Sequence, residues 1–266
     1  MNMIVCVKQV LDPEAPPAKF KIDPVTNNIV PPADVPPVIS PFDEQAVEAA
    51  LRLKDIHGGK ITIISLGINL QRDVVKKPLS MGADELILLE DPAFVDGDSW
   101  STACALAAAI KKIGQYDLIF CGRQAADWDA GQVGSGIAEI LGLPLVTIAR
   151  KIEADNGKIR VEKVTADGYE VVETTMPALI TVSNELGEPR YATIKGIIAA
   201  KNEEPTVWKP GDIGIDAAKL GAAGRRLKLR KIFQPVHESH CEIITGADDE
   251  DAGIKLAQKL AAAKLL

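Results

Sequence analysis

The amino-acid sequence predicts an α/β fold with a mostly parallel, doubly wound sheet, an antiparallel extension and a C-terminal arm. From residue 3 to about residue 145, short apolar runs alternate with segments of helical periodicity. This alternation indicates parallel strands joined by crossover helices. After Leu143-Pro144 the chain contains β-rich runs separated by Asn156-Gly157 and Asp167-Gly168, which are typical hairpin turns. We expect these runs to extend the same sheet.

The first helix has clear start and stop signals. Ser40 and Pro41 have the order of an N-cap and first turn, Asp43 suits the positive end of the helix, and Gly58-Gly59 ends it. The expected strands are residues 4–7, 61–65, 85–90, 118–121, 145–153, 159–164, 170–174 and 179–182. The other expected elements are helices at 69–81, shortened or kinked by Pro78, at 101–113 and at about 249–264, and a hairpin around Ile22 and Ile29 with Asn27-Asn28 at its turn.

Composition limits the possible partners. With 266 residues, 47% of them hydrophobic and 4% aromatic, the chain can bury one large aliphatic core. The formal charge of −7 argues against binding to nucleic acid or to an anionic membrane surface. The start, MNMIVCVKQV, has no signal-peptide pattern, and no apolar run approaches the ~20 residues that span a bilayer. We therefore expect a cytoplasmic protein with no membrane insertion.

The C-terminal region looks less self-contained. Beyond residue 200, prolines and glycines interrupt the pattern, and a basic cluster occupies residues 225–231. We expect residues 1–200 to form a nucleotide-binding α/β domain and residues 201–266 to form an extended arm and helix that pack on another subunit. A flexible tail is the alternative.

The cysteines and histidines do not indicate a metal site. Cys6, Cys104, Cys121 and Cys241 form no C-x-x-C pair. The segment 237–241 collects two histidines and a cysteine, but no second ligand cluster completes a site. We expect no metal, and we expect Cys6 and Cys121 to be small buried hydrophobic residues.

The segment LIFCGRQAADWDAGQVGSG at 118–136 carries the most functional information. Its apolar strand ends at Gly122, and Asp129 with Gln132 forms a capping pair that predicts a helix start near Ala130. Free amides at such a start favour phosphate, although the same shape also occurs as a plain connection. Neither G-x-G-x-x-G nor G-x-x-x-x-G-K-[ST] is present, which disfavours a standard dinucleotide dehydrogenase or P-loop enzyme. A ligand would lie where residues 6–9, 66–67 and 122–133 meet, beyond the carboxyl ends of the strands.

Six blocks follow one another along nearly the whole chain: VCVKQV, SPFDEQAVEAALRLKD, LSMGADELILL, CGRQAADWDAGQVG, MPALITVSNELGEPRYATIKGI and KPGDIGID. Together they resemble the β subunit of the electron-transfer flavoprotein family. The combination of GRQA-x-D-x-D-x-x-Q-x-G with EPRYAT is the most specific part. The resemblance implies a sheet of the adenine-nucleotide alpha-hydrolase type.

The resemblance also implies an electron carrier without catalytic side chains. Such a β subunit pairs with an α subunit that carries FAD, and itself holds a second nucleotide, AMP in simple carriers or FAD in electron-bifurcating members. The implied cofactor-binding residues are Cys6, Ser40, Pro41, Phe42, Asp43, Leu66, Gly122, Arg123, Gln124, Ala125, Ala126, Asp127, Trp128, Asp129, Ala130, Gly131, Gln132 and Val133.

Roles within this set follow from the residue types. We expect main-chain contacts to adenine near Cys6 and Leu66, and phosphate at the amides of 130–133. Asp127 and Gln132 would anchor polar groups, with Asp127 as a ribose or water ligand and Asp129 as the helix cap.

The segment Glu188, Pro189, Arg190, Tyr191, Ala192, Thr193, Ile194 resembles the family's partner-recognition loop. In the family, its aliphatic tip docks into a flavin-containing dehydrogenase of the acyl-CoA dehydrogenase type. Ile194 occupies the tip, and an ordinary buried isoleucine is the alternative. AMP-binding carriers continue with a proline and a lysine-rich run, whereas residues 195–201 here read KGIIAAK.

The choice between FAD and AMP stays open. The opening KQV and the 122–134 loop are closer to the branch with bifurcating members, and favour FAD with NAD(H) as electron donor. Two features differ from that branch and weaken the preference for FAD. Residue 128 is Trp128, where the branch often has glycine, and a proline-rich insertion at 13–17 interrupts the usual spacing after KQV.

Two other functions fit parts of the sequence. A stand-alone adenine-nucleotide-binding domain, of the stress-protein or ATP-pyrophosphatase type, shares the strand-end pocket. A hydrolase using Asp127 or Asp129 with His57 is disfavoured, because no G-x-S-x-G elbow is present.

Overall fold

The structure is a computed structural model that describes the whole chain except residues 27, 236–240 and 266. The chain divides into two compact units, residues 1–230 and residues 231–266, which we describe separately. Over the described residues, no helix is both long and apolar enough to cross a membrane.

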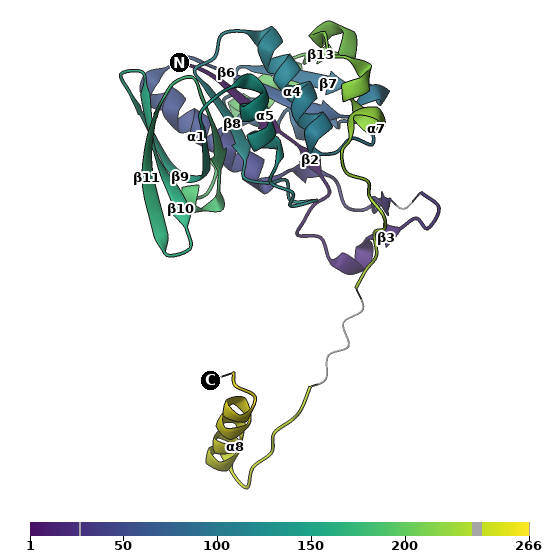
Figure 1. Cartoon of the computed structure of the whole chain (residues 1–266), viewed down its shortest axis with the longest axis vertical. Coiled ribbons are helices and arrows are strands. Elements are labelled where there is room, and N and C mark those ends of the chain that lie inside the picture. The colour runs from purple at the N-terminus through teal and green to yellow at the C-terminus, as the bar shows by residue number, and fades with distance from the viewer. Residues whose placement is uncertain (27, 236–240, 266) are drawn as a thin grey trace. The chain divides into compact units, whose positions relative to one another are not determined.

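A nine-stranded sheet forms the centre of the first unit, in the order β11-β10-β9-β12-β8-β1-β6-β7-β13. From β9 to β13 in that order, neighbouring strands run parallel, and the β10/β11 hairpin continues the sheet with antiparallel pairing (Figure 1). The predicted α/β fold with an antiparallel extension is therefore confirmed. The strands are β1 Asn2–Val7, β6 Lys60–Gly67, β7 Glu85–Glu90, β8 Leu118–Gly122, β9 Leu145–Asp155, β10 Lys158–Thr165, β11 Gly168–Thr175, β12 Ala178–Val182 and β13 Thr206–Trp208.

Helices cover both faces of the sheet. In β1, Met3, Val5 and Val7 belong to the buried cluster beneath α1, whereas Ile4 and Cys6 belong to the cluster beneath α4 and α5. Successive side chains of a strand point to opposite faces, so both sides of the sheet are apolar and both are covered. The helices of these layers are α1 Pro41–His57, α3 Lys77–Met81, α4 Ser99–Ile113, α5 Val133–Leu141 and α6 Ile194–Asn202.

The expected helix over 69–81 is wrong as a single element. It divides into α2 Arg72–Val75 and α3 Lys77–Met81. Pro78 lies in the first turn of α3 instead of shortening the last turn of a longer helix. A proline lacks the N–H that an interior turn needs, but the first turn leaves that donor unpaired in any case.

The small elements include the predicted hairpin, whose strands β3 Lys21–Ile22 and β4 Ile29–Val30 pair antiparallel. Of its predicted turn, Asn27 lies outside the described residues. A second short pair joins β2 Gln9–Val10 to β5 Val38–Ile39. The remaining short helices are η1 Pro17–Lys19, η2 Pro92–Phe94, η3 Asn184–Leu186, η4 Pro210–Ile213, η5 Ala217–Lys219 and α7 Gly221–Gly224.

Residues 201–230 belong to the first unit, where β13 adds an edge strand beside β7. The second unit contains the predicted final helix, α8 Asp249–Ala262. Packing of the 201–266 region on another subunit stays a prediction.

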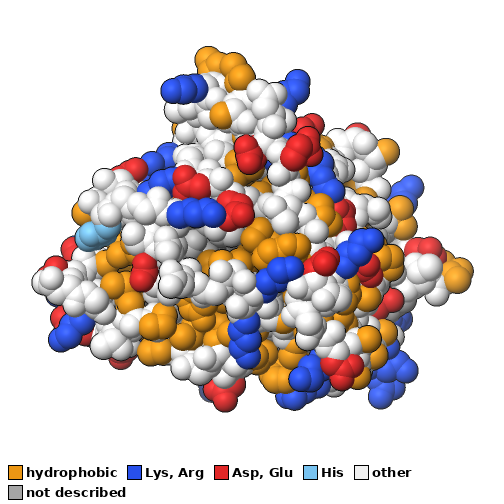
Figure 2. All heavy atoms as spheres, turned by 90° about the horizontal axis from the view of Figure 1, so that it is seen from above, with side chains coloured by type: hydrophobic (Ala, Val, Ile, Leu, Met, Phe, Trp, Pro, Cys, Tyr) orange, Lys and Arg blue, Asp and Glu red, His pale blue; other side chains and the backbone are white. Residues whose placement is uncertain are grey.

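Charges of both signs are mixed on the face of the molecule shown in Figure 2. Lysine and arginine side chains alternate there with aspartate and glutamate, and hydrophobic side chains lie between them. An extended basic surface of the kind that tracks a nucleic-acid backbone is not seen on this face.

Candidate functional site

A cavity of about 680 Å³ lies within the first unit at the carboxyl ends of β1, β6 and β8. Cys6, Leu66 and Cys121 contribute from these strands, and the start of α4 and the loop between β8 and α5 form its sides. This is the edge where parallel α/β sheets bind ligands, and the volume is in the range of cofactor sites.

Asp43, in the first turn of α1, joins two of these strand ends. Its Oδ2 accepts a hydrogen bond from the Lys8 amide at 2.9 Å, and its Oδ1 accepts one from the Gly122 amide at 3.0 Å. The side chain is buried, and burial raises the pKa of Asp43 from 3.8 to about 7, although the two amides act in the opposite direction. The carboxylate therefore sets the spacing of β1 and β8 at the cavity floor.

Gly122 has to lack a side chain because of this contact. A Cβ at Gly122 would lie 2.5 Å from Asp43 Oδ1 and 2.8 Å from the Phe42 carbonyl carbon. The chain can thus leave β8 directly beside the start of α1.

Ser40 does not act as the predicted side-chain cap. It stands at the N-cap position of α1, but its hydroxyl does not bond to the helix. Instead, Ser40 Oγ accepts a hydrogen bond from the Ala126 amide at 3.3 Å. The amides of Asp43 and Glu44 bond to the Ser40 carbonyl, which leaves the hydroxyl to support the loop after β8.

The predicted helix start near Ala130, with Asp129 as cap, is also wrong. Asp129 and Gly131 have φ of +49° and +62°, a left-handed conformation that a right-handed helix does not contain. The Asp129 carboxylate accepts from Gln124 Nε2 at 2.8 Å, and α5 begins only at Val133. Within the described part of the chain, no side chain caps this helix, so its first amides are available to an anion.

Two cations of the cavity wall, Lys8 and Arg123, directly follow the ends of β1 and β8. The Lys8 ammonium forms an ion pair with Asp127 at 2.7 Å, and the Arg123 guanidinium lies 4.8 Å from the centre of the Phe42 ring. The buried Arg123 Nε has no hydrogen-bond partner among the described residues. A buried N–H donor without an acceptor destabilises the fold unless a ligand or a water molecule accepts its hydrogen bond.

The cavity wall includes most, but not all, of the residues that the sequence implied. Ser40, Pro41, Phe42, Ala126, Asp127 and Asp129 are not part of the lining. Those that line it are Cys6, Asp43, Leu66, Gly122, Arg123, Gln124, Ala125, Trp128, Ala130, Gly131, Gln132 and Val133.

Sequence reasoning missed two walls. One is the start of α4, where Asp98 and Ser101 form a reciprocal capping box; the order Asp98-Ser-Trp-Ser101 is a signal that could have located it. The other comprises Arg225, Leu227, Lys228 and Leu229, which are far from the other walls in sequence and carry no motif.

The segment 188–194 is anchored at its base and exposed at its tip. The buried Glu48 of α1 accepts three hydrogen bonds from Arg190, from the backbone amide, Nε and Nη2. Burial alone would raise the pKa of Glu48, but hydrogen bonds from Arg190 and Arg52 outweigh it and lower the pKa. Tyr191 and Ile194 are 97% and 79% exposed, which excludes the alternative of an ordinary buried isoleucine.

Metal ligands do not gather anywhere in the described residues. His237 and His240 lie outside that part of the chain. Cys6 and Cys121 are free and buried on neighbouring strands, as expected. A hydrogen bond with Cys6, together with burial, raises the pKa of the Cys121 thiol, so Cys121 is a poor nucleophile.

Comparison with known proteins gives one family. Residues 29–213 match the electron transfer flavoprotein domain. The chain is 40% identical over 262 residues to the electron transfer flavoprotein subunit beta of Clostridium acetobutylicum, covering 94% of this chain and 99% of the relative. It is 40% identical over 275 residues to the subunit beta of Megasphaera elsdenii, covering 100% of both. It is 38% identical over 261 residues to the caffeyl-CoA reductase-Etf complex subunit CarD of Acetobacterium woodii, covering 98% of both.

Gly122→Ala is expected to destabilise the protein by about 1–3 kcal/mol, because the new methyl group overpacks against Asp43 and the backbone of Phe42. Chemical denaturation measures the change. The matched control is Gly211→Ala, since a Cβ at Gly211 meets nothing within 4 Å. Equal losses for the two variants would contradict the close contact at Gly122.

Asp43 is expected to make stability fall as pH rises from about 4 to about 7. The folded-state pKa of about 7 lies above the unfolded value of 3.8, so the folded state binds the proton more tightly. The advantage is complete below the unfolded pKa and is lost as pH passes the folded pKa, by at most about 4 kcal/mol. Denaturation of parent and Asp43→Asn across this range isolates the effect; a pH-independent difference between them would rule it out.

Proposed function

The chain belongs to the electron transfer flavoprotein family as a β subunit, and from this premise we propose that it holds FAD in the cavity at the ends of β1 and β8. Subunits of this kind act in electron transfer, paired with an α subunit and with redox partners. The proposal concerns which nucleotide this subunit binds, where it lies and what receives the electrons.

The extent of the cavity is the observation that carries the choice of FAD. It continues from the loop after β8 to the start of α4 and on to residues 225–229. AMP would fill only the part near the strand ends, whereas FAD contains all of AMP together with a second phosphate, a ribityl chain and a large ring system. Trp128, which lines the cavity and is 55% exposed, offers an aromatic face for stacking.

The donors at the strand ends fit a phosphate ester. The first amides of α5 have no side-chain cap, and Arg123 Nε is buried without a partner among the residues described. Both features favour an anion between them. We assign adenine to main-chain contacts near Cys6 and Leu66. Asp127 is assigned to holding Lys8, with which it is paired, instead of to the ribose.

FAD bound here would accept and release electrons, and the protein contributes its position and surroundings. We propose NAD(H) as donor and a division of the electron pair between two acceptors, one of them the FAD of the α subunit. The similarity to a subunit of a caffeyl-CoA reductase-Etf complex supports this assignment.

The exposed segment 188–194 supports a role in contact with a dehydrogenase. Ile194 is apolar and exposed, and Arg190 of the same segment is bound to Glu48 and Asp55. An exposed apolar residue on an anchored segment is typical of a preformed docking point. We propose a flavin-containing dehydrogenase of the acyl-CoA dehydrogenase type as its partner. We also propose that residues 231–266 pack on the α subunit. The exposed segment favours a heterodimer subunit over the stand-alone nucleotide-binding domain.

The nucleotide content of the purified heterodimer tests the choice of FAD. We expect two FAD per heterodimer, counted by absorbance and chromatography after denaturation. One FAD with one AMP would show a simple carrier and refute the FAD proposal. A β subunit without nucleotide would refute the site itself.

Ile194→Asp is expected to slow electron delivery to the dehydrogenase at least tenfold and to leave the nucleotide content unchanged, because burying an unpaired charge at an interface is unfavourable. Rates of acceptor reduction by the complex measure this. Val171→Asp, on the distant edge strand β11, is the control for an exposed apolar residue changed to Asp. Parental rates for Ile194→Asp would eliminate the docking role.

A further inference from the structure

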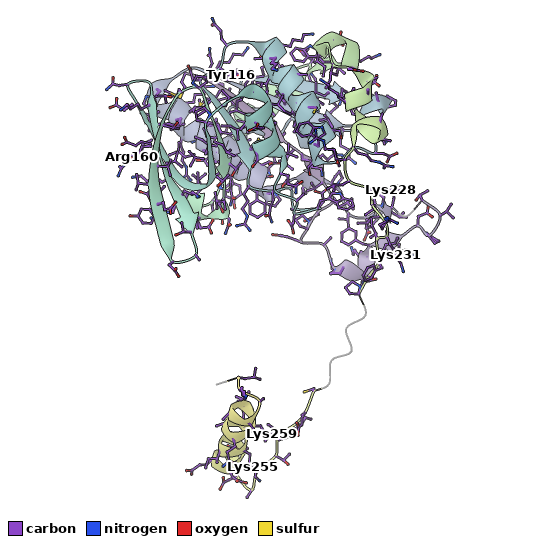
Figure 3. The ribbon with its side chains drawn as sticks, viewed as in Figure 1. Tyr116, Arg160, Lys228, Lys231, Lys255 and Lys259 are labelled. Atoms are coloured by element: carbon purple, nitrogen blue, oxygen red, sulfur yellow. The ribbon has the colours of Figure 1, made fainter. Side chains whose placement is uncertain are left out.

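Residues 225–229, here named the basic strap, form a wall of the cavity that neither the motifs nor the family resemblance indicated. Arg225, Leu227, Lys228 and Leu229 all line it. The strap follows α7 as extended chain, and Figure 3 marks Lys228 on it. Leu227 and Leu229 are 63% and 43% exposed, so a ligand in the cavity would cover apolar surface that now faces water.

Asp98 holds the basic strap in place. Its Oδ2 accepts hydrogen bonds from the amides of Arg226 and Leu227 at 2.7 and 2.8 Å, while its Oδ1 caps α4 at the Ser101 amide at 3.0 Å. Burial would raise the pKa of Asp98, but these amides outweigh it and lower the pKa. The Arg226 guanidinium also lies 3.6 Å from the centre of the Trp100 ring. The strap is therefore a fixed wall.

In addition to Arg123, two cations that line the cavity have no carboxylate partner among the described residues. Lys8 is already paired with Asp127, and the Asp98 carboxylate is occupied by backbone amides. Arg225 and Lys228 form no ion pair with any residue that the structure describes. Asp43 and Asp96 also line the cavity, so a phosphate group there is favoured only beside cations that have no carboxylate partner.

We propose that Arg225 and Lys228 of the basic strap bind the phosphate groups of the nucleotide, and that Asp98 is the positioning residue that presents them. This rests on the proposed function only in taking the ligand to be a nucleotide. A diphosphate gains more from a second cationic wall than a monophosphate does, since it carries more charge over a longer span. The strap would thus contribute to the preference for FAD over AMP.

Lys228→Gln tests the phosphate contact in the intact αβ heterodimer. The change removes the charge from a side chain of similar length, and we expect the Kd of the β-subunit site for FAD to rise about tenfold, as for loss of a charge-assisted hydrogen bond. Lys228→Arg should restore parental affinity. Arg230→Gln is the matched control, because Arg230 is exposed nearby and does not line the cavity.

Asp98→Asn tests the positioning role separately. Asparagine is also a good N-cap, so α4 should persist. With its one oxygen on the Ser101 amide, its NH2 group faces the two strap amides, and an NH2 group donates and cannot accept from them. We expect faster tryptic cleavage within 225–230 and about tenfold weaker FAD binding, with a parental thermal midpoint for the rest of the first unit. Asp91→Asn is the control, since Asp91 caps only η2.

The outcomes separate this inference from the proposed function. If the parental heterodimer holds AMP in the β subunit, the FAD proposal fails, and the same variants measured with AMP still test the strap. If Lys228→Gln and Arg230→Gln bind the nucleotide equally, the strap contributes no phosphate contact and the inference is overturned. If Asp98→Asn keeps parental cleavage and affinity, Asp98 is not the anchor.

Discussion

The hydrogen bonds of Asp43 to the ends of β1 and β8 determine the shape of the site. At the end of a parallel sheet, strands diverge and their last amides lose ladder partners, so an acceptor has to be supplied from elsewhere. Asp43 accepts from Lys8 and Gly122 at once. A buried carboxylate without a contacting cation is unfavourable, and its raised pKa reflects that cost. This arrangement holds two strand ends and the start of α1 together at the floor of the cavity.

The path of the chain after Gly122 follows from this point. Gly122 has no side chain, so the chain can pass close to the start of α1 without a clash. In the loop that follows, the Ala126 amide donates to Ser40 Oγ. The left-handed residues Asp129 and Gly131 then turn the chain before α5 begins. Most strands of the sheet were predictable from the sequence because period-two and period-3.6 patterns are local. The helix start was not, because an Asp followed three residues later by Gln resembles a cap, and only the backbone dihedrals show otherwise.

The parts of the site that the sequence did not reveal come from long-range contacts. The local capping box at Asp98 predicts the start of α4. No local pattern predicts that the other carboxylate oxygen of Asp98 accepts hydrogen bonds from the amides of residues 226 and 227. The same holds for Arg190, whose link to Glu48 spans 142 positions. A sequence pattern specifies which face of an element is buried; it does not specify which distant loop supplies a partner. The resemblance to a family covered the loops with motifs and left the basic strap unassigned.

Helix α1 connects the cavity with the segment 188–194. Asp43 in its first turn fixes the floor of the cavity, and Glu48, five positions later, fixes the base of the segment that ends at Ile194. Five residues correspond to ~7.5 Å along a helix axis, a spacing that a packed helix does not change. Between these two points, Ala46 and Val47 are fully buried against the sheet, so the helix cannot shift without disrupting the core. A partner docked at Ile194 would therefore meet a cavity whose position relative to the docking point is set by one rigid element.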